Sequence, residues 1–119
     1  MSKSEIRSLR EQVQGASALN VGQFDQAAVL VRRVFPQMPE PRGGADIVGQ
    51  ILHGVDLCLP GWTIQLTGKA QEPDGHWRCS LRETRGSDEV EIIGLGTGRV
   101  VEVALLEALL HVAEQKAVV

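Results

Sequence analysis

The spacing of apolar residues predicts two helices in the first third of the chain. One is expected over Ser2–Gln14 and the other over Gln23–Phe35, each with apolar residues three and four positions apart. The residues that share the inner faces are Ile6, Leu9 and Val13 in the first helix and Phe24, Ala28, Val31 and Phe35 in the second. The apolar stripe of the first helix is thin, so we expect that helix to dock on the rest of the protein or on a partner, or to fray.

A segment rich in proline and glycine separates these helices from the rest of the chain. Residues 36–44 contain three prolines and two glycines, which oppose both a helix and an interior strand. We therefore predict an N-terminal helical appendage over residues 1–44 and a main domain over residues 45–119.

The pattern after residue 45 predicts a helix and then three strands. Asp46 is a candidate N-cap for a helix that ends at Pro60. Alternation of apolar and polar residues then marks the strands, the third over Glu89–Leu95. The residues expected to point inward are Trp62, Ile64 and Leu66 in the first strand, Trp77, Cys79 and Leu81 in the second, and Val90 and Ile92 in the third. Turn-forming residues between the strands favour an antiparallel meander.

The last helix, expected from about Arg99 to Lys116, contains eleven apolar residues among eighteen. This arc is wider than the stripe of a helix that covers one sheet. Either the helix lies between the sheet and the N-terminal helices, which we favour, or it also forms a homodimer interface. The residues assigned to that interface are Val103, Leu106 and Leu110. The fold expected is α+β, with an α-β-β-β-α domain in which helices cover one face of a three-stranded antiparallel sheet.

Length and composition indicate one globular domain. The chain has 119 residues, of which 43% are hydrophobic and 23% are charged, which is typical of a folded protein. The N-terminus is polar, and no apolar run approaches the roughly 20 residues of a membrane span. We therefore expect a cytoplasmic protein without a membrane partner. Cys58 and Cys79 lack metal-ligand spacing and are expected to be reduced thiols, with a disulfide as the alternative.

Charge is distributed unevenly along the chain. Residues 1–44 carry six basic and four acidic residues, a net +2, whereas residues 45–119 carry six basic and eleven acidic residues, a net −5. An acidic main domain disfavours nucleic-acid binding, which depends on neutralised phosphates. The residues that could still form such a surface are Arg78, Arg82, Arg99 and His76, together with Arg32 and Arg33 if their helix lies beside the sheet.

No group of residues predicts catalysis or a metal site. Gly94, Gly96 and Gly98 precede the last helix, where backbone N–H groups could bind a phosphate with Thr97 and Arg99. Their spacing is not that of a dinucleotide site or a P-loop, so we interpret them as a structural turn between a strand and the helix. The three histidines are dispersed, and no nucleophile, base and orienting residue stand together. We expect no enzyme activity, no cofactor and no metal.

The chain from residue 45 to about residue 115 resembles the phage ABA sandwich domain. The features that carry the resemblance are a helix, a strand with Trp62, the Gly75-His76-Trp77 start of the next strand, and a last helix rich in alanine and leucine. The strand over Val90–Leu95 and the N-terminal region depart from that family. The resemblance implies a phage or mobile-element setting and no settled activity.

The α-β-β-β-α order also resembles a double-stranded RNA-binding domain. That family has a lysine cluster at the start of its last helix, whereas this chain has Arg99, Val100, Val101 and Glu102 there. A similar topology therefore need not carry the binding surface. We expect a non-enzymatic accessory protein of phage or mobile-element type that binds another protein or a copy of itself, with nucleic-acid binding as the alternative.

Overall fold

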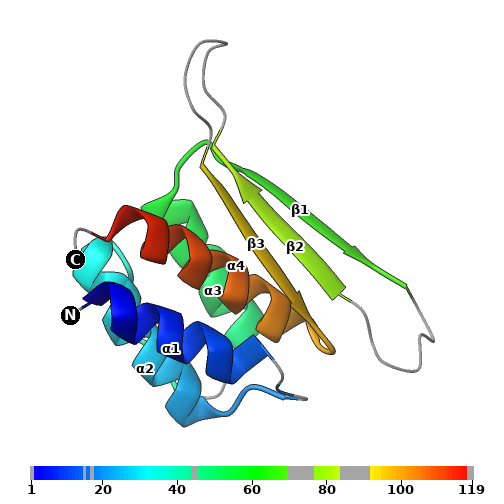
Figure 1. The fold of residues 1–119 in the computed structure, drawn as a ribbon, viewed down its shortest axis with the longest axis horizontal. Helices are drawn as coiled ribbons and strands as arrows, with labels where there is room; N and C mark the ends of the chain where they lie inside the picture. Colours follow the sequence, from blue (N-terminus) through cyan, green and yellow to red (C-terminus); the bar gives the residue numbers. More distant parts are fainter. Residues whose placement is uncertain are drawn as a thin grey trace.

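Three helices, three strands and a fourth helix follow one another along the chain (Figure 1). The computed structural model describes residues 2–14, 16, 18–43, 46–69, 77–83 and 92–117. The helices are α1 (Ser2–Gln14), α2 (Val21–Val34), α3 (Ile47–Cys58) and α4 (Val101–Lys116), and the strands are β1 (Thr63–Gly68), β2 (Trp77–Arg82) and β3 (Ile93–Gly98). The predicted α+β class is confirmed.

The three strands form one antiparallel sheet in the order β1-β2-β3, so β1 and β3 are its edges. Leu81 is paired with Ile64 on one side and with Gly94 on the other, and Cys79 is paired with Leu66 and Gly96. Paired residues point to the same face of a sheet. The four helices are gathered on that face, which leaves the other face open (Figure 1).

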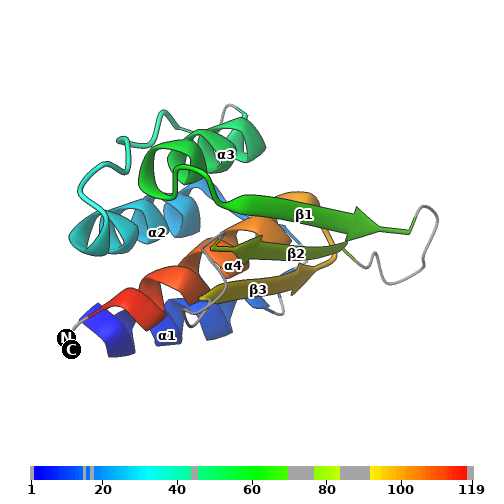
Figure 2. The same ribbon diagram turned by 90° about the horizontal axis from the view of Figure 1, so that it is seen from above.

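Helix α4 packs on β3 and β2, and its remaining sides are covered by α1, α2 and α3 (Figure 2). Eleven of its sixteen residues are buried. Val103, Leu106 and Leu110 are 0% exposed. The side chains assigned to an interface are therefore core residues, and a second copy could reach them only if a packed helix or the sheet moved away. The wide apolar arc of α4 is explained within one chain.

The glycines of β3 let α4 approach the sheet at backbone distance. Gly94, Gly96 and Gly98 alternate along the strand and face the helix. A Cβ atom added at Gly96 would overlap the carbonyl oxygen of Ala104 and lie 2.6 Å from the backbone nitrogen of Ala108. The interpretation of these glycines as a turn is wrong, because they lie inside a strand. The third strand was expected over Glu89–Leu95; within the described residues it runs from Ile93 to Gly98, three residues beyond the predicted end, and Glu89, Val90 and Glu91 lie outside the described residues.

Helices α1 and α2 share one hydrophobic core with the rest of the protein. The apolar residues that they bury include Ile6, Leu9, Val13, Phe24, Ala28 and Val31. Arg7 of α1 binds Glu114 of α4, with 2.8 Å between Nε and Oε2, and Arg10 lies 3.5 Å from the same carboxylate. We expected α1 to dock on the rest of the protein or on a partner, or to fray; the structure shows that it docks on the rest of the protein. The domain boundary near residue 44 stays a prediction.

Side-chain caps set the starts of α2 and α3. Asn20 accepts a bond from the Gln23 N–H, and the Gln23 side chain accepts one from the Asn20 N–H, so α2 begins two residues before the predicted start. Asp46 accepts a bond from the Gly49 N–H at 3.0 Å, which confirms the predicted cap. Within the described residues, no helix is long and apolar enough to cross a membrane.

Candidate functional site

The outer edge of β3 is covered by three polar side chains of α4. The Leu95 N–H donates to Nδ1 of His111 (3.0 Å), the Thr97 N–H donates to Oε1 of Glu107 (2.7 Å), and Nε2 of Gln115 donates to the carbonyl oxygen of Ile93 (2.8 Å). The three side chains are four residues apart and lie on one side of the helix. Three backbone groups that could otherwise bind another strand are thus bonded within the chain. We call the outer side of β3 the closed edge.

Burial changes the titration of two groups at the closed edge. Burial raises the pKa of Glu107, while the backbone hydrogen bond and the charge of Arg10 lower it. Burial also lowers the pKa of His111, with Arg10 acting in the same direction and Glu114 opposing it. His111 is therefore neutral near pH 7, the form in which Nδ1 accepts a hydrogen bond from the β3 backbone.

The backbone direction in β3 determines which groups point outward in β1. In an antiparallel sheet, residues that bond to one neighbouring strand alternate with residues that bond to the other. The residues of β3 that bond to α4 are odd-numbered, so the even-numbered ones bond to β2. The register carries this alternation through β2 to β1. There, Ile64, Leu66 and Gly68 direct their N–H and C=O groups away from the sheet.

The outer side of β1, which we call the open edge, has no such cover from the residues that the structure describes. All six residues of the strand are exposed, and no hydrogen bond joins the outward groups of Ile64, Leu66 or Gly68 to another residue in the described part of the chain. Ile64 and Leu66 point to the face that carries α4, yet each is 38% exposed. Natural edge strands are usually protected by a charge, a proline, a bulge or a covering segment. Residues 63–68 contain neither a charge nor a proline.

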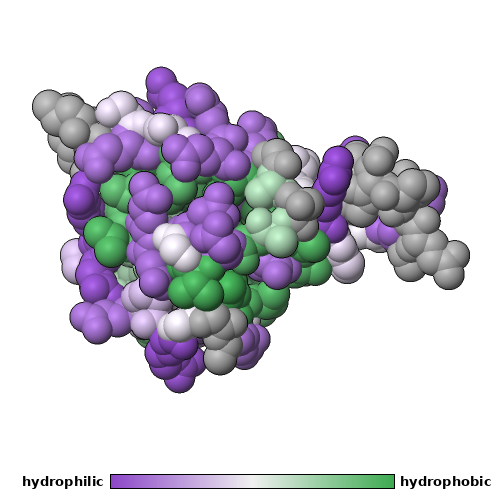
Figure 3. All heavy atoms as spheres, turned by 90° about the horizontal axis from the view of Figure 1, so that it is seen from below, coloured by the Kyte–Doolittle hydropathy of each residue, from purple (hydrophilic) through white to green (hydrophobic). Residues whose placement is uncertain are grey.

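Other exposed apolar residues are dispersed. The large ones outside β1 are Val21, Val29, Leu52, Leu57 and Leu95, which come from α2, α3 and β3. On the face seen in Figure 3, hydrophobic residues lie between hydrophilic ones. Ile64 and Leu66 differ from these residues in one respect. They are exposed apolar residues whose own N–H and C=O groups point outward and have no hydrogen bond within the described part of the chain.

The open face of the sheet collects polar side chains from all three strands. A shallow groove on this face is lined by Gln65, Thr67, Arg78, Cys79, Ser80, Leu95, Gly96 and Thr97. Arg78 and Arg82 both project from β2 on this side and are exposed, and Arg99 follows β3. The structure thus brings two of the expected basic residues together on one strand. His76 lies outside the described residues.

Arg32 and Arg33 lie on α2, which packs with the helices and away from the open face (Figure 2). Nε of Arg32 donates to the carbonyl oxygen of Met38 (2.9 Å), and its guanidinium lies 3.6 Å from Glu40. Arg33 binds Glu5 at 3.1 Å. The condition under which these two residues were expected to assist Arg78 and Arg82 is not met, because α2 does not lie beside the open face.

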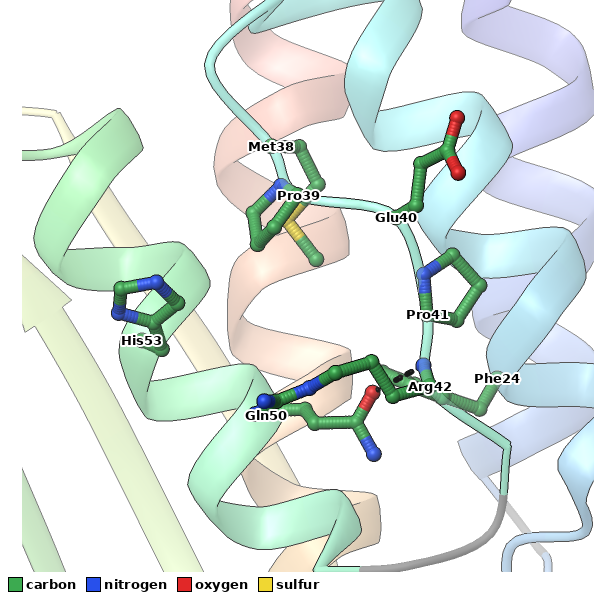
Figure 4. A pocket seen from close by; sticks show the side chains of 8 residues that line it. All are labelled: Phe24, Met38, Pro39, Glu40, Pro41, Arg42, Gln50 and His53. Carbon is green, nitrogen blue, oxygen red and sulfur yellow. Dashed lines mark hydrogen bonds between the residues drawn. The ribbon is translucent and has the colours of Figure 1, made fainter.

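A small pocket of about 200 Å³ lies between the proline-rich segment and α3 (Figure 4). The residues that line it are Phe24, Met38, Pro39, Glu40, Pro41, Arg42, Gln50 and His53. Oε1 of the buried Gln50 accepts a bond from the Arg42 N–H (2.7 Å), and its Nε2 donates to the Gly43 carbonyl (3.3 Å). The pocket therefore forms where the linker is fixed to α3, and the amide of Gln50 is used for that purpose.

Cys58 and Cys79 are free thiols, as predicted. Burial raises the pKa of each to about 11, which keeps both in the unreactive thiol form near neutral pH. Among the residues that the structure describes, no group of three or more His, Cys, Asp and Glu residues could hold a metal ion.

These features define an α+β protein with a one-sided sheet, one edge of which is closed and the other open. Comparisons with protein-family models, with curated proteins and with solved structures found no match. Sequence reasoning missed both edges. Two signals were present: glycine at every second position from 94 to 98, and polar residues at intervals of four in α4.

Proposed function

We propose that this protein is a non-enzymatic accessory protein that binds another protein chain along the open edge of β1. The observation that supports the proposal is the contrast between the edges. Three side chains of α4 bond to the outward groups of β3, whereas no described residue bonds to those of Ile64 and Leu66. The proposal includes the phage or mobile-element setting, which is supported by the resemblance to the ABA sandwich domain.

Binding at such an edge proceeds by strand addition. The incoming segment is extended, and its backbone bonds to the outward N–H and C=O groups of β1, which provide affinity whatever the sequence of the segment. Its alternate side chains contact Ile64 and Leu66 on one face and Gln65 on the other, and these contacts provide specificity. The lack of charge on residues 63–68 favours an uncharged segment.

A matched pair of lysine substitutions tests this proposal. Ile64→Lys places a charge beside the open edge, and Leu95→Lys makes a similar change at the closed edge, where the native side chain is 56% exposed. Peptides selected from a random displayed library for binding to the native protein should lose about tenfold in affinity for Ile64→Lys and little for Leu95→Lys. A selection that yields no binder, or binders that tolerate Ile64→Lys, contradicts the proposal.

A second candidate function is nucleic-acid binding at the open face, which is favoured by the placement of Arg78 and Arg82 on one side of β2. Phosphate contacts weaken steeply with salt, so gel-shift titrations at about 50 mM salt are the most sensitive test. Duplex RNA, duplex DNA and single strands should each be tried with the native chain and with Arg78→Glu/Arg82→Glu. A shift that the double variant abolishes supports this candidate, and no shift at micromolar protein excludes it.

A further inference from the structure

We infer that the strand received at the open edge is β1 of a second copy, so that two sheets join into one across a two-fold axis at Gln65. The inference rests on the proposed function and names the partner of the same edge. Four observations support it: the alternation of backbone bonds, the order of side chains in β1, the side on which the helices lie, and the absence of charge.

The backbone allows only a few symmetric pairings. The outward groups of β1 belong to even-numbered residues, and in an antiparallel pair outward groups must meet outward groups. The two-fold axis must therefore pass through a residue of β1, such as Ile64, Gln65 or Leu66, and not between two residues. An axis at Leu66 places Ile64 opposite Gly68, and an axis at Ile64 extends the pairing to Trp62, before the start of β1. The axis at Gln65 places Ile64 of each copy opposite Leu66 of the other.

The same symmetry covers apolar surface. An axis between paired antiparallel edge strands is perpendicular to the sheet, so the helices of both copies lie on one side. Ile64 and Leu66 point to that side, and the two pairs form a cluster of four aliphatic side chains in place of two pairs that are each 38% exposed. On the other side, Gln65 meets Gln65, and Thr63 meets Thr67.

Charge also favours a second copy. The chain has a net charge of −3, which opposes self-association in general. The six residues of β1 are uncharged, so the proposed pairing places no like charges opposite one another. A charged strand would find no opposite charge on β1, whereas another β1 matches it in polarity from Thr63 to Thr67.

Disulfide trapping tests both the pairing and its register. Gln65 falls in a non-hydrogen-bonded pair, where Cα atoms are about 4.5 Å apart, within the range that a disulfide spans. Gln65→Cys should form covalent dimers under mild oxidation about tenfold faster than Thr97→Cys, which lies on the same face at the closed edge. Thr67→Cys alone should be slow, but an equal mixture of Thr63→Cys and Thr67→Cys chains should cross-link. The native chain, with its two native thiols, measures the background.

Sedimentation separates this inference from the proposed function. The native chain should form a dimer that Ile64→Lys abolishes and Leu95→Lys retains. A native chain that stays monomeric at several hundred micromolar, or Gln65→Cys that cross-links no faster than Thr97→Cys, overturns the inference. If the selected peptides still require Ile64 in that case, the open edge binds a different chain and the proposed function stands. If they do not, both are overturned.

Discussion

The two edge strands of the sheet show how one helix can protect one edge at the expense of the other. Alternate glycines in β3 bring α4 within backbone distance, which lets Glu107, His111 and Gln115 reach around the strand to its outer groups. Helix α4 lies over β3 and β2. Among the described elements, the main contact of β1 is therefore with β2 and not with α4. Close packing and an exposed edge thus have one cause, the lateral position of α4.

The largest effect is expected when the contact between β3 and α4 is broken. Gly96→Ala should destabilise the fold by about 3 kcal/mol, because the added methyl group overlaps helix backbone that has no side chain to move. Gly68→Ala is the matched control in β1. Its methyl group would meet the ring of Trp77, a half-buried side chain and not helix backbone, so we expect a smaller cost than at Gly96. Urea unfolding measures both, and equal costs would contradict the contrast between the edges.

The next effect concerns the bond that closes the edge at Thr97. Glu107→Ala removes a buried carboxylate that accepts the Thr97 N–H at 2.7 Å, so we expect a loss of about 2 kcal/mol of unfolding free energy. Glu107→Gln keeps an acceptor oxygen and removes a buried charge. Because burial raises the pKa of Glu107, the glutamine variant should be as stable as the native protein at pH 7, or more stable. A glutamine variant that loses as much stability as the alanine variant would show that the charge, and not the bond, closes the edge.

The periodicity of hydrophobic residues along the chain predicted most of the fold. Ile6, Leu9 and Val13 define the buried face of α1, whose predicted bounds match the structure, and Cys79 and Leu81 identify the inner face of β2. These elements could be predicted because each needs only its own pattern of buried positions. The wide apolar arc of α4 likewise indicated that more than the sheet covers it.

The edges could not be predicted in the same way, because they depend on where α4 lies across the sheet. Periodicity correctly put Ile64 and Leu66 on the helix-bearing face, but it does not say that α4 stops short of them. Periodicity also does not reveal that Glu107, a charged residue of α4, is only 4% exposed and accepts a hydrogen bond from the backbone of β3. Lateral position is a tertiary property, and here it follows from the glycines of β3.

Amide hydrogen exchange compares the two edges directly. At low protein concentration, the Leu95 and Thr97 amides should exchange about fivefold more slowly than the Leu66 amide, because each donates to a side chain of α4. Raising the concentration should slow exchange at Ile64 and Leu66 and leave β3 unchanged if β1 pairs with a second copy. Equal protection at both edges in dilute protein would contradict the assignment of β1 as open.

The smallest effect is a pH dependence at the closed edge. The pKa of His111 is lowered in the folded protein, chiefly by burial, so the folded state binds a proton less readily than the unfolded state does. This contribution to stability is complete above the ordinary pKa of 6.5 and is lost as the pH falls below it.

The raised pKa of Glu107 acts in the opposite direction at lower pH, so Glu107→Gln is the better background for the measurement. In that background, acidification from pH 7.5 to about 5.5 should weaken the chain with His111 more than the chain with His111→Gln, whose amide oxygen can accept the Leu95 N–H without titrating. Urea unfolding at both pH values gives the comparison, and identical pH dependence in the two chains would mean that the bond to His111 does not contribute to closing the edge.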